Sequence, residues 1–105
     1  MIIKEVVVSP EFRKDFDKLD TDLQNKVREI LRSIEYGEKI EGVSHIPLRG
    51  DLTGFTSVHF NSNSYRLIYK PMKDKFKVLV LTIGPRGDEG DIYDKLRKLK
   101  DKRKL

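Results

Sequence analysis

Residues 65–93 read YRLIYKPMKDKFKVLVLTIGPRGDEGDIY, and this stretch decides most of the fold. Two runs within it, residues 65–70 and 76–83, are rich in β-branched, aromatic and other apolar residues, as is typical of strands joined by a short turn. The Gly84-Pro85 dipeptide ends the second run, and apolar residues recur from Ile92 onward at the spacing of an amphipathic helix. The stretch therefore predicts two antiparallel strands, a loop and a helix.

The residues that precede this stretch in the chain predict two further strands. Residues 55–60 alternate well enough for a strand, and the turn-rich cluster 61–64 joins them to the next strand. Residues 2–8 are β-branched and predict a first strand that ends at Ser9-Pro10. Residues 38–44 show no convincing period and residues 48–54 are rich in turn residues, so we expect this stretch to form a long connection into the sheet.

Two helices are expected between the first strand and this connection. Ser9 and Pro10 are typical of an N-cap and a first helical position. The segment from Thr21 to Gln24 fits a capping box for a second helix, which Gly37 would end as the C-cap glycine. The predicted order is β-α-α-β-β-β-α, an α+β fold in which a helix hairpin packs on a twisted, mostly antiparallel sheet.

Composition limits the classes of protein to consider. A chain of 105 residues has room for one domain, which we expect to span 1–105. The net charge of +5 suits a partner with phosphates or an acidic surface. No cysteine is present, so thiolate chemistry and disulfides are excluded. The apolar runs are too short for a signal peptide or a membrane span, and we expect a cytoplasmic protein without a membrane partner.

The phrases LRGDLTG at 48–54, YRLIYK at 65–70, VLVLTIGPR at 78–86 and DIY at 91–93, in this order of elements, resemble the RelE/ParE superfamily of toxins. The resemblance spans nearly the whole chain. It implies a toxin of a type II toxin-antitoxin system that cleaves mRNA on the ribosome, without a metal or other cofactor, and that a cognate antitoxin protein inhibits.

The resemblance also implies site residues. In the RNA-cleaving members, two arginines and a tyrosine lie at positions that correspond here to Arg66, Arg86 and Tyr93. The arginines would grip the scissile phosphate, since a planar guanidinium suits phosphate oxygens, and Tyr93 would stack on a base or orient the leaving group. RelE has two lysines on the preceding strand, where this chain has Ser57 and His59.

Our hypothesis for the general base is His59, because an imidazole exchanges protons near neutral pH. Three of the site residues also have a structural interpretation. His59 would be an exposed strand residue, Arg66 would pair across the sheet, and Tyr93 would pack against it. His45 has no partner that the sequence identifies, and two histidines so far apart do not predict a metal site.

A basic surface is the remaining candidate site. The candidate contacts to RNA or the ribosome are Arg49, Lys95, Arg97, Lys98 and Lys100. Phosphate contacts of this kind add affinity without reading sequence. A solvated helix face is the alternative interpretation. Two alternative functions also remain open: a non-enzymatic, ParE-like inhibitor of DNA gyrase, and a degenerate relative that binds an antitoxin without catalysis.

Overall fold

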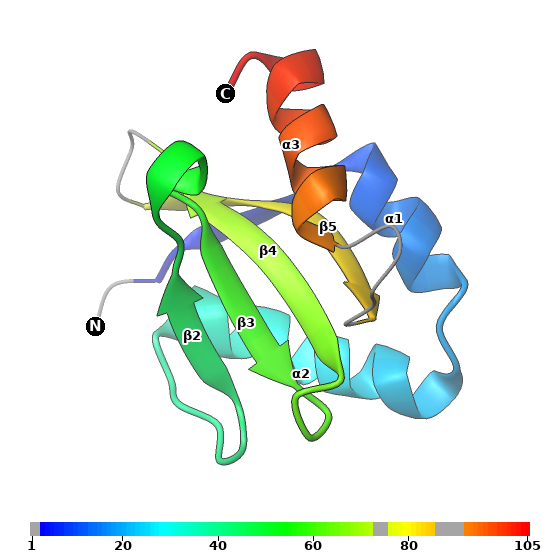
Figure 1. Ribbon diagram of the computed structural model, residues 1–105. Coiled ribbons are helices and arrows are strands. Elements are labelled where there is room, and N and C mark those ends of the chain that lie inside the picture. The colour runs from blue at the N-terminus through cyan, green and yellow to red at the C-terminus, as the bar shows by residue number, and fades with distance from the viewer. Residues whose placement is uncertain (1–2, 73–75, 86–91) are drawn as a thin grey trace.

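The computed structural model describes residues 3–72, 76–85 and 92–105, and in these residues five strands form one sheet with helices on both faces (Figure 1). The elements follow in the order β1 (Glu5–Val8), α1 (Pro10–Asp17), α2 (Thr21–Tyr36), β2 (Ser44–Pro47), the 3-10 helix η1 (Gly50–Leu52), β3 (Thr56–Phe60), β4 (Tyr65–Pro71), β5 (Lys77–Pro85) and α3 (Ile92–Arg103). The predicted α+β class and order are confirmed, with β2 and η1 added.

The strands lie in the order β1-β5-β4-β3-β2. β1 runs parallel to β5, and every other neighbouring pair is antiparallel, so the sheet is mostly antiparallel as expected. The register between β4 and β5 shifts between Ile68 and Tyr69. Beyond this irregularity, Tyr65 and Arg66 at the start of β4 lie opposite Pro85 and Gly84 at the end of β5.

The first helix is tied directly to the sheet by its cap. The Ser9 hydroxyl accepts a hydrogen bond from the amide of Phe12 at 3.0 Å and donates one to the carbonyl of Leu81 at 2.6 Å. This buried hydroxyl thus satisfies a free amide of α1 and a carbonyl of β5 together. The prediction of Ser9 as N-cap is confirmed.

The second helix begins one residue earlier than the capping box predicts. Asp20 is the N-cap, and its carboxylate accepts from the amide of Leu23 at 2.8 Å. Thr21 is already helical, and the side chain of Gln24 donates to the carbonyl of Phe16 at 3.0 Å instead of bonding back to Thr21. An ionised aspartate competes well with threonine for this position, because its charge also interacts with the helix dipole.

The sheet separates two apolar cores. The helix hairpin α1–α2 covers one face, where the buried residues are Phe12, Val27, Ile30, Ile34, Val58, Phe60, Leu67, Val78, Val80 and Ile83. Helix α3 covers part of the other face, where the buried residues are Leu52, Phe55, Ile68, Leu81, Ile92 and Leu96. Because side chains alternate along a strand, the central strands β4 and β5 contribute to both cores.

The strand β2 was not predicted, and the expectation of an unbroken connection over residues 38–54 is wrong in this part. Its residues Ser44–Pro47 are all exposed, and they pair with β3 at the edge of the sheet. A strand with no buried face leaves no alternation in the sequence. Its backbone pairing with β3 is what holds it in the sheet.

Candidate functional site

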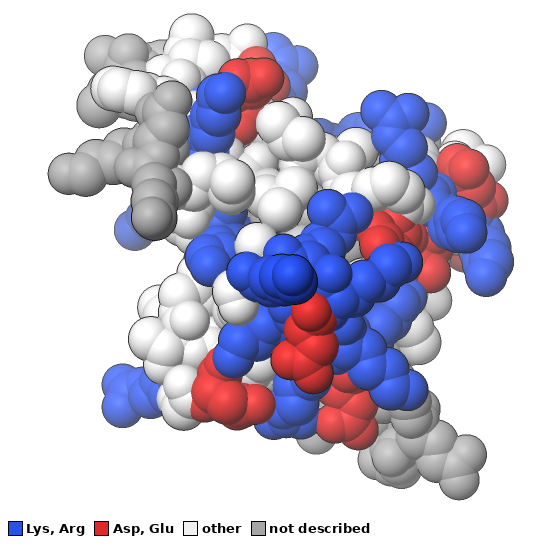
Figure 2. Space-filling view, turned by 90° about the horizontal axis from the view of Figure 1, so that it is seen from above, with Lys and Arg blue, Asp and Glu red and all other residues white. Residues whose placement is uncertain are grey.

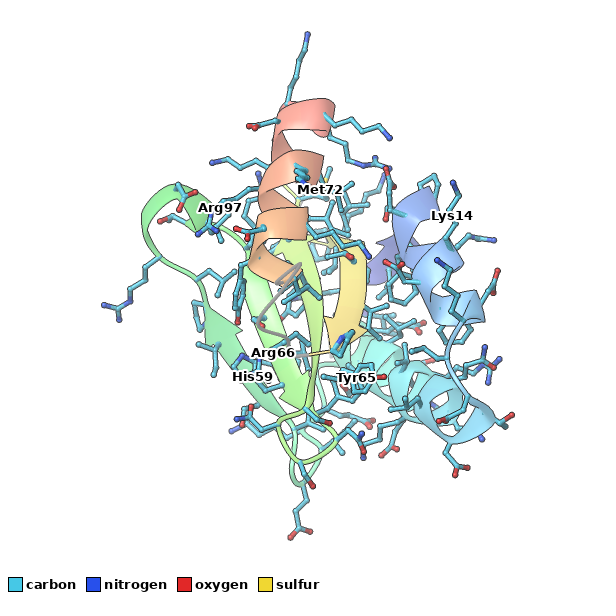
Figure 3. The ribbon with its side chains drawn as sticks, turned by 45° about the vertical axis from the view of Figure 1, so that its right-hand side comes forward. Lys14, His59, Tyr65, Arg66, Met72 and Arg97 are labelled. Carbon is cyan, nitrogen blue, oxygen red and sulfur yellow. The ribbon has the colours of Figure 1, made fainter. Side chains whose placement is uncertain are left out.

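The candidate site lies on the α3 face of the sheet, at the end where β3 finishes and β4 begins. Val58 and Phe60 of β3 point into the hairpin core, so Ser57 and His59 point to the opposite face. On β4, Arg66 is the cross-strand partner of His59. Figure 3 shows the His59 and Arg66 side chains near each other at this end of the sheet.

Arg66 is buried with only 6% of its surface exposed, and the turn that precedes it holds its guanidinium. Its Nη1 donates to the carbonyl oxygen of Asn63 at 2.9 Å and to the side-chain oxygen of Asn63 at 2.8 Å. Among the described residues, its Nε and Nη2 make no hydrogen bond. One nitrogen therefore anchors the arginine, while the rest of the guanidinium retains donors for a ligand.

His59 shares the same asparagine. Its Nδ1 lies 3.2 Å from the side-chain oxygen of Asn63, so one amide oxygen links the histidine and the arginine. The structural interpretation of Arg66 as a cross-strand partner is thus correct in geometry. This pairing does not exclude that Arg66 binds a ligand, because it also places the guanidinium of Arg66 beside the imidazole of His59.

Tyr93 reaches the same face from the first turn of α3. Its hydroxyl lies 3.3 Å from the Ser57 hydroxyl, and its ring is partly buried against the core under α3. Gly84 at the end of β5 lies against the first turn of α3, where a Cβ built on it would be in ordinary contact with a methyl group of Ile92 at 3.5 Å. Ser57, His59, Arg66 and Tyr93 therefore lie on one face around the end of β5.

Arg86 lies outside the described residues. The last described residue before it, Pro85, is the cross-strand partner of Tyr65. The role of Arg86 stays a prediction from the resemblance.

The basic residues of α3 are largely engaged within the protein. Arg97 binds Asp51 at 2.9 Å and Asp94 at 2.8 Å, Lys95 forms an ion pair with Asp15, and Lys100 donates to the carbonyl of Asp51. The hydrogen bond from Arg97 lowers the pKa of Asp51. Acidic neighbours therefore neutralise part of the predicted RNA-binding surface.

Two candidate contacts differ from these. Arg49 and Lys98 are exposed, and neither forms an ion pair within the part of the chain that the structure describes. Figure 2 looks onto the C-terminal end of α3, where Lys and Arg side chains gather with Asp and Glu side chains among them. The surface is thus mixed in charge, with basic side chains in excess on α3.

The end of α3 is fixed to α1 through Glu11. Arg103 donates to this carboxylate at 2.9 Å, and Lys102 lies 3.5 Å away. The hydrogen bond from Arg103 is the main cause that lowers the pKa of Glu11 to about 2. The ion pairs of Glu11 and Asp15 thus bind α3 to α1 at two points along its length.

The second histidine has a partner that the sequence did not reveal. His45 Nδ1 lies 3.1 Å from the hydroxyl of Tyr69, and both residues line an open cavity of about 530 Å³ between β2, β4 and the end of α2. Burial lowers the pKa of His45 and raises that of Tyr69. Because His45 pairs with Val58 and Tyr69 packs on the hairpin core, this cavity is on the face opposite His59.

Asn63 is the site residue that sequence reasoning missed. The cluster Asn61–Ser64 signals a turn, and nothing in the sequence distinguishes its two asparagines. Only the three-dimensional turn, in which Asn63 has a φ of +68°, directs its side chain toward His59 and Arg66.

No group of three or more histidine, cysteine, aspartate or glutamate side chains suited to a metal ion occurs among the described residues. Within the same residues, no helix has the length and apolar character needed to cross a membrane.

Comparison with protein-family models gives no match, and comparison with curated protein sequences gives no significant match. Solved structures do match. The RelBE2 toxin-antitoxin complex of Mycobacterium tuberculosis contains a chain that is 25% identical, with a TM-score of 0.65 over 81% of this chain and 100% of that one. A mutant of the E. coli RelE toxin in the free state is 21% identical, with a TM-score of 0.71 over 92% of this chain and 97% of that one.

A third similar structure is a YoeB/ParE toxin from Agrobacterium tumefaciens, which is 18% identical with a TM-score of 0.62 over 75% of this chain and 94% of that one. At this identity the likeness shows the fold. In this chain, that fold has the strand order β1-β5-β4-β3-β2, with the helix hairpin on one face of the sheet and the C-terminal helix on the other. The fold of this chain is therefore the one found in RelE-like toxins.

Proposed function

We propose that this protein is the toxin of a toxin-antitoxin pair and cleaves mRNA on the ribosome without a metal ion. The observation that carries the proposal is the cross-strand pair of His59 and Arg66, on the face that Ser57 and Tyr93 share. An imidazole beside a guanidinium offers a proton acceptor and a cation for one phosphate. The similar structures with RelB, or with a RelB peptide, support an antitoxin as partner.

RNA carries its own nucleophile, the 2′-hydroxyl. In the proposed reaction His59 removes the 2′-hydroxyl proton, and the 2′-oxygen attacks the neighbouring phosphorus. Arg66 and Arg86 stabilise the charge that grows on the phosphate oxygens. The bond from phosphorus to the 5′-oxygen breaks, and the 5′-oxygen takes up a proton from water, while the imidazolium returns its proton to solvent.

The position of His59 on the strand supports its role as base. By the resemblance, it stands where RelE has a lysine; a lysine is almost fully protonated at neutral pH and then has no lone pair, whereas a neutral imidazole can accept a proton. The anchored Nη1 of Arg66 keeps the guanidinium in place before substrate binds, which lowers the cost of organising the site.

The test is a coupled translation reaction in which mRNA ends are mapped on the ribosome. His59→Gln should lower the cleavage rate by about 10²–10⁴-fold, the usual contribution of a general base. The chain provides a matched control in His45→Gln, a histidine of the opposite face whose loss should leave cleavage unchanged. Arg86→Ala should abolish cleavage while antitoxin binding is retained. Full activity of His59→Gln would exclude His59 as base.

A gyrase inhibitor is the second candidate. Its support is that both RelE lysines are replaced here, by Ser57 and His59, and that one similar structure is described as a YoeB/ParE toxin. Intact mRNA together with inhibited DNA supercoiling by gyrase in the same extract would establish it. Intact mRNA, active gyrase and retained antitoxin binding would identify a degenerate toxin.

A further inference from the structure

The orientation of the Asn63 side chain is fixed by chemistry. A guanidinium nitrogen only donates hydrogen bonds, so the Asn63 atom 2.8 Å from Arg66 Nη1 is the amide oxygen. The usual ambiguity between the oxygen and nitrogen of an amide does not arise, because the reversed amide would point a donor at a donor.

That oxygen determines the protonation of His59. His59 Nδ1 lies 3.2 Å from the same Asn63 oxygen, which only accepts, so Nδ1 carries the proton. In a neutral imidazole with its proton on Nδ1, the lone pair is on Nε2, an atom that is buried in the free protein, so substrate binding must expose it. The hydrogen bond to Asn63 is also kept when the ring becomes an imidazolium, so the ring can take up a proton at Nε2 without turning.

The turn that carries Asn63 is strained in a way that serves this arrangement. Asn61, Ser62 and Asn63 have φ angles of +53°, +54° and +68°, a region that serine in particular rarely adopts. The Ser64 hydroxyl donates to the carbonyl of Asn61 at 2.6 Å and accepts from the Asn61 side chain at 3.2 Å, which holds the turn. Strained backbone of this kind concentrates at functional sites.

We propose that Asn63 is a positioning residue for His59. It holds the imidazole in the tautomer with Nδ1–H, so that Nε2 is the atom that accepts the 2′-hydroxyl proton. The same Asn63 oxygen also binds Arg66. The catalytic part of this inference rests on the proposed function. The tautomer itself is a property of the free protein and is measured without substrate.

The first measurement is the ¹⁵N shift pattern of the two histidines in the free wild-type protein, at a pH above their titration. His59 should show the pattern of the Nδ1–H tautomer.

Asn63→Gly keeps the left-handed backbone and the carbonyl that Arg66 binds but removes the amide oxygen, and the Nδ1–H fraction should fall. Asn63→Asp restores an acceptor for both partners and should keep the Nδ1–H form. The matched control is Asn61→Gly, in the same turn without a contact to His59.

The second measurement is cleavage. Asn63→Gly should lower kcat about tenfold or more with little change in KM, because the wrong tautomer presents no base to the 2′-hydroxyl. Asn63→Asp should regain most of the loss. An Nε2–H tautomer in the wild type, or a tautomer unchanged by Asn63→Gly, would overturn the inference. A wild type with the Nδ1–H tautomer that leaves mRNA intact would overturn the proposed function alone.

Discussion

Side-chain alternation in the sheet separates the two histidines of the chain onto opposite faces. His45 belongs to the hairpin side, where it contacts Tyr69, and His59 belongs to the α3 side, where it contacts Asn63. A strand places neighbouring residues on opposite faces, so the face of His59 follows from the buried Val58 and Phe60 beside it. The two histidines can therefore be compared as site and control within one fold.

Substitutions at Tyr93 distinguish a role of its ring from a role of its hydroxyl. Its hydroxyl contacts Ser57, and its ring lies at the edge of the site. Tyr93→Phe removes the hydroxyl alone, whereas Tyr93→Ala removes the ring as well. If the ring stacks on a base, the cleavage rate of Tyr93→Phe should stay within a few fold of the wild-type rate. Tyr93→Ala should instead weaken substrate binding by about 1–3 kcal/mol. The measurement is KM and kcat for ribosome-bound mRNA. A large fall in kcat for Tyr93→Phe would contradict stacking and assign the role to the hydroxyl.

Among the elements, α3 depends on partners far from it in sequence. Glu11 and Asp15 of α1 and Asp51 of η1 bind its basic side chains, while Leu96 and Ile92 pack under it. A helix of this size gains little stability by itself in water. Its position over the sheet is consequently set by these ion pairs together with the apolar contacts.

Substitution of Glu11 tests this attachment. Its pKa is about 2, below the ordinary 4.5, so the carboxylate contributes stability that is present above pH 4.5 and is lost as the pH falls toward 2. Glu11→Gln should lower the free energy of unfolding at pH 7 by about 1–2 kcal/mol, as expected for a hydrogen-bonded charge. The difference from wild type should shrink below pH 4.5. Urea unfolding at several pH values measures it.

The control for Glu11 is Glu29→Gln. Glu29 is more exposed and pairs with Lys26 at 3.6 Å within one helix, so its loss should cost at most about 0.5 kcal/mol. Equal effects of the two substitutions at pH 7 would show that Glu11 does not attach α3 to α1.

The elements with a buried face were predictable, and those without one were not. The strands at 65–70 and 76–83 and both helices of the hairpin carry periodic apolar residues, and the structure contains all four close to the predicted bounds. β2 has no buried residue, so it gives no period. The cap of α2 was misassigned because Asp20 and Thr21 are both good N-caps, and only the backbone geometry separates them.

The candidate site was predictable in its residue types but not in its connections. Cross-strand register follows from two strands and a short turn, so His59 and Arg66 could be expected to lie close together. The contact through Asn63 depends on three successive left-handed residues, a conformation that no local pattern specifies. Likewise, the pairing of α3 lysines and arginines with α1 and η1 requires the tertiary fold.

For the molecule as a whole, net charge overstates the free basic surface. The chain carries +5, yet several cations of α3 face carboxylates on other elements. Only cations not already neutralised within the protein release counterions from RNA in full on binding. Under the proposed function, the charge that contacts the ribosome should thus come from residues such as Arg49 and Lys98, and less from Arg97.

Charge reversal at matched positions tests this distribution. Lys98→Glu and Arg49→Glu should each weaken ribosome binding and reduce the slope of log affinity against log salt by about 1, because each removes one phosphate contact. Arg97→Glu should instead lower the midpoint of thermal unfolding, since it places a third acid beside Asp51 and Asp94. Lys39→Glu, in the exposed loop after α2 on the opposite side, is the control for net charge. Equal slopes for Lys98→Glu, Arg49→Glu and wild type would show that α3 and Arg49 do not contact RNA.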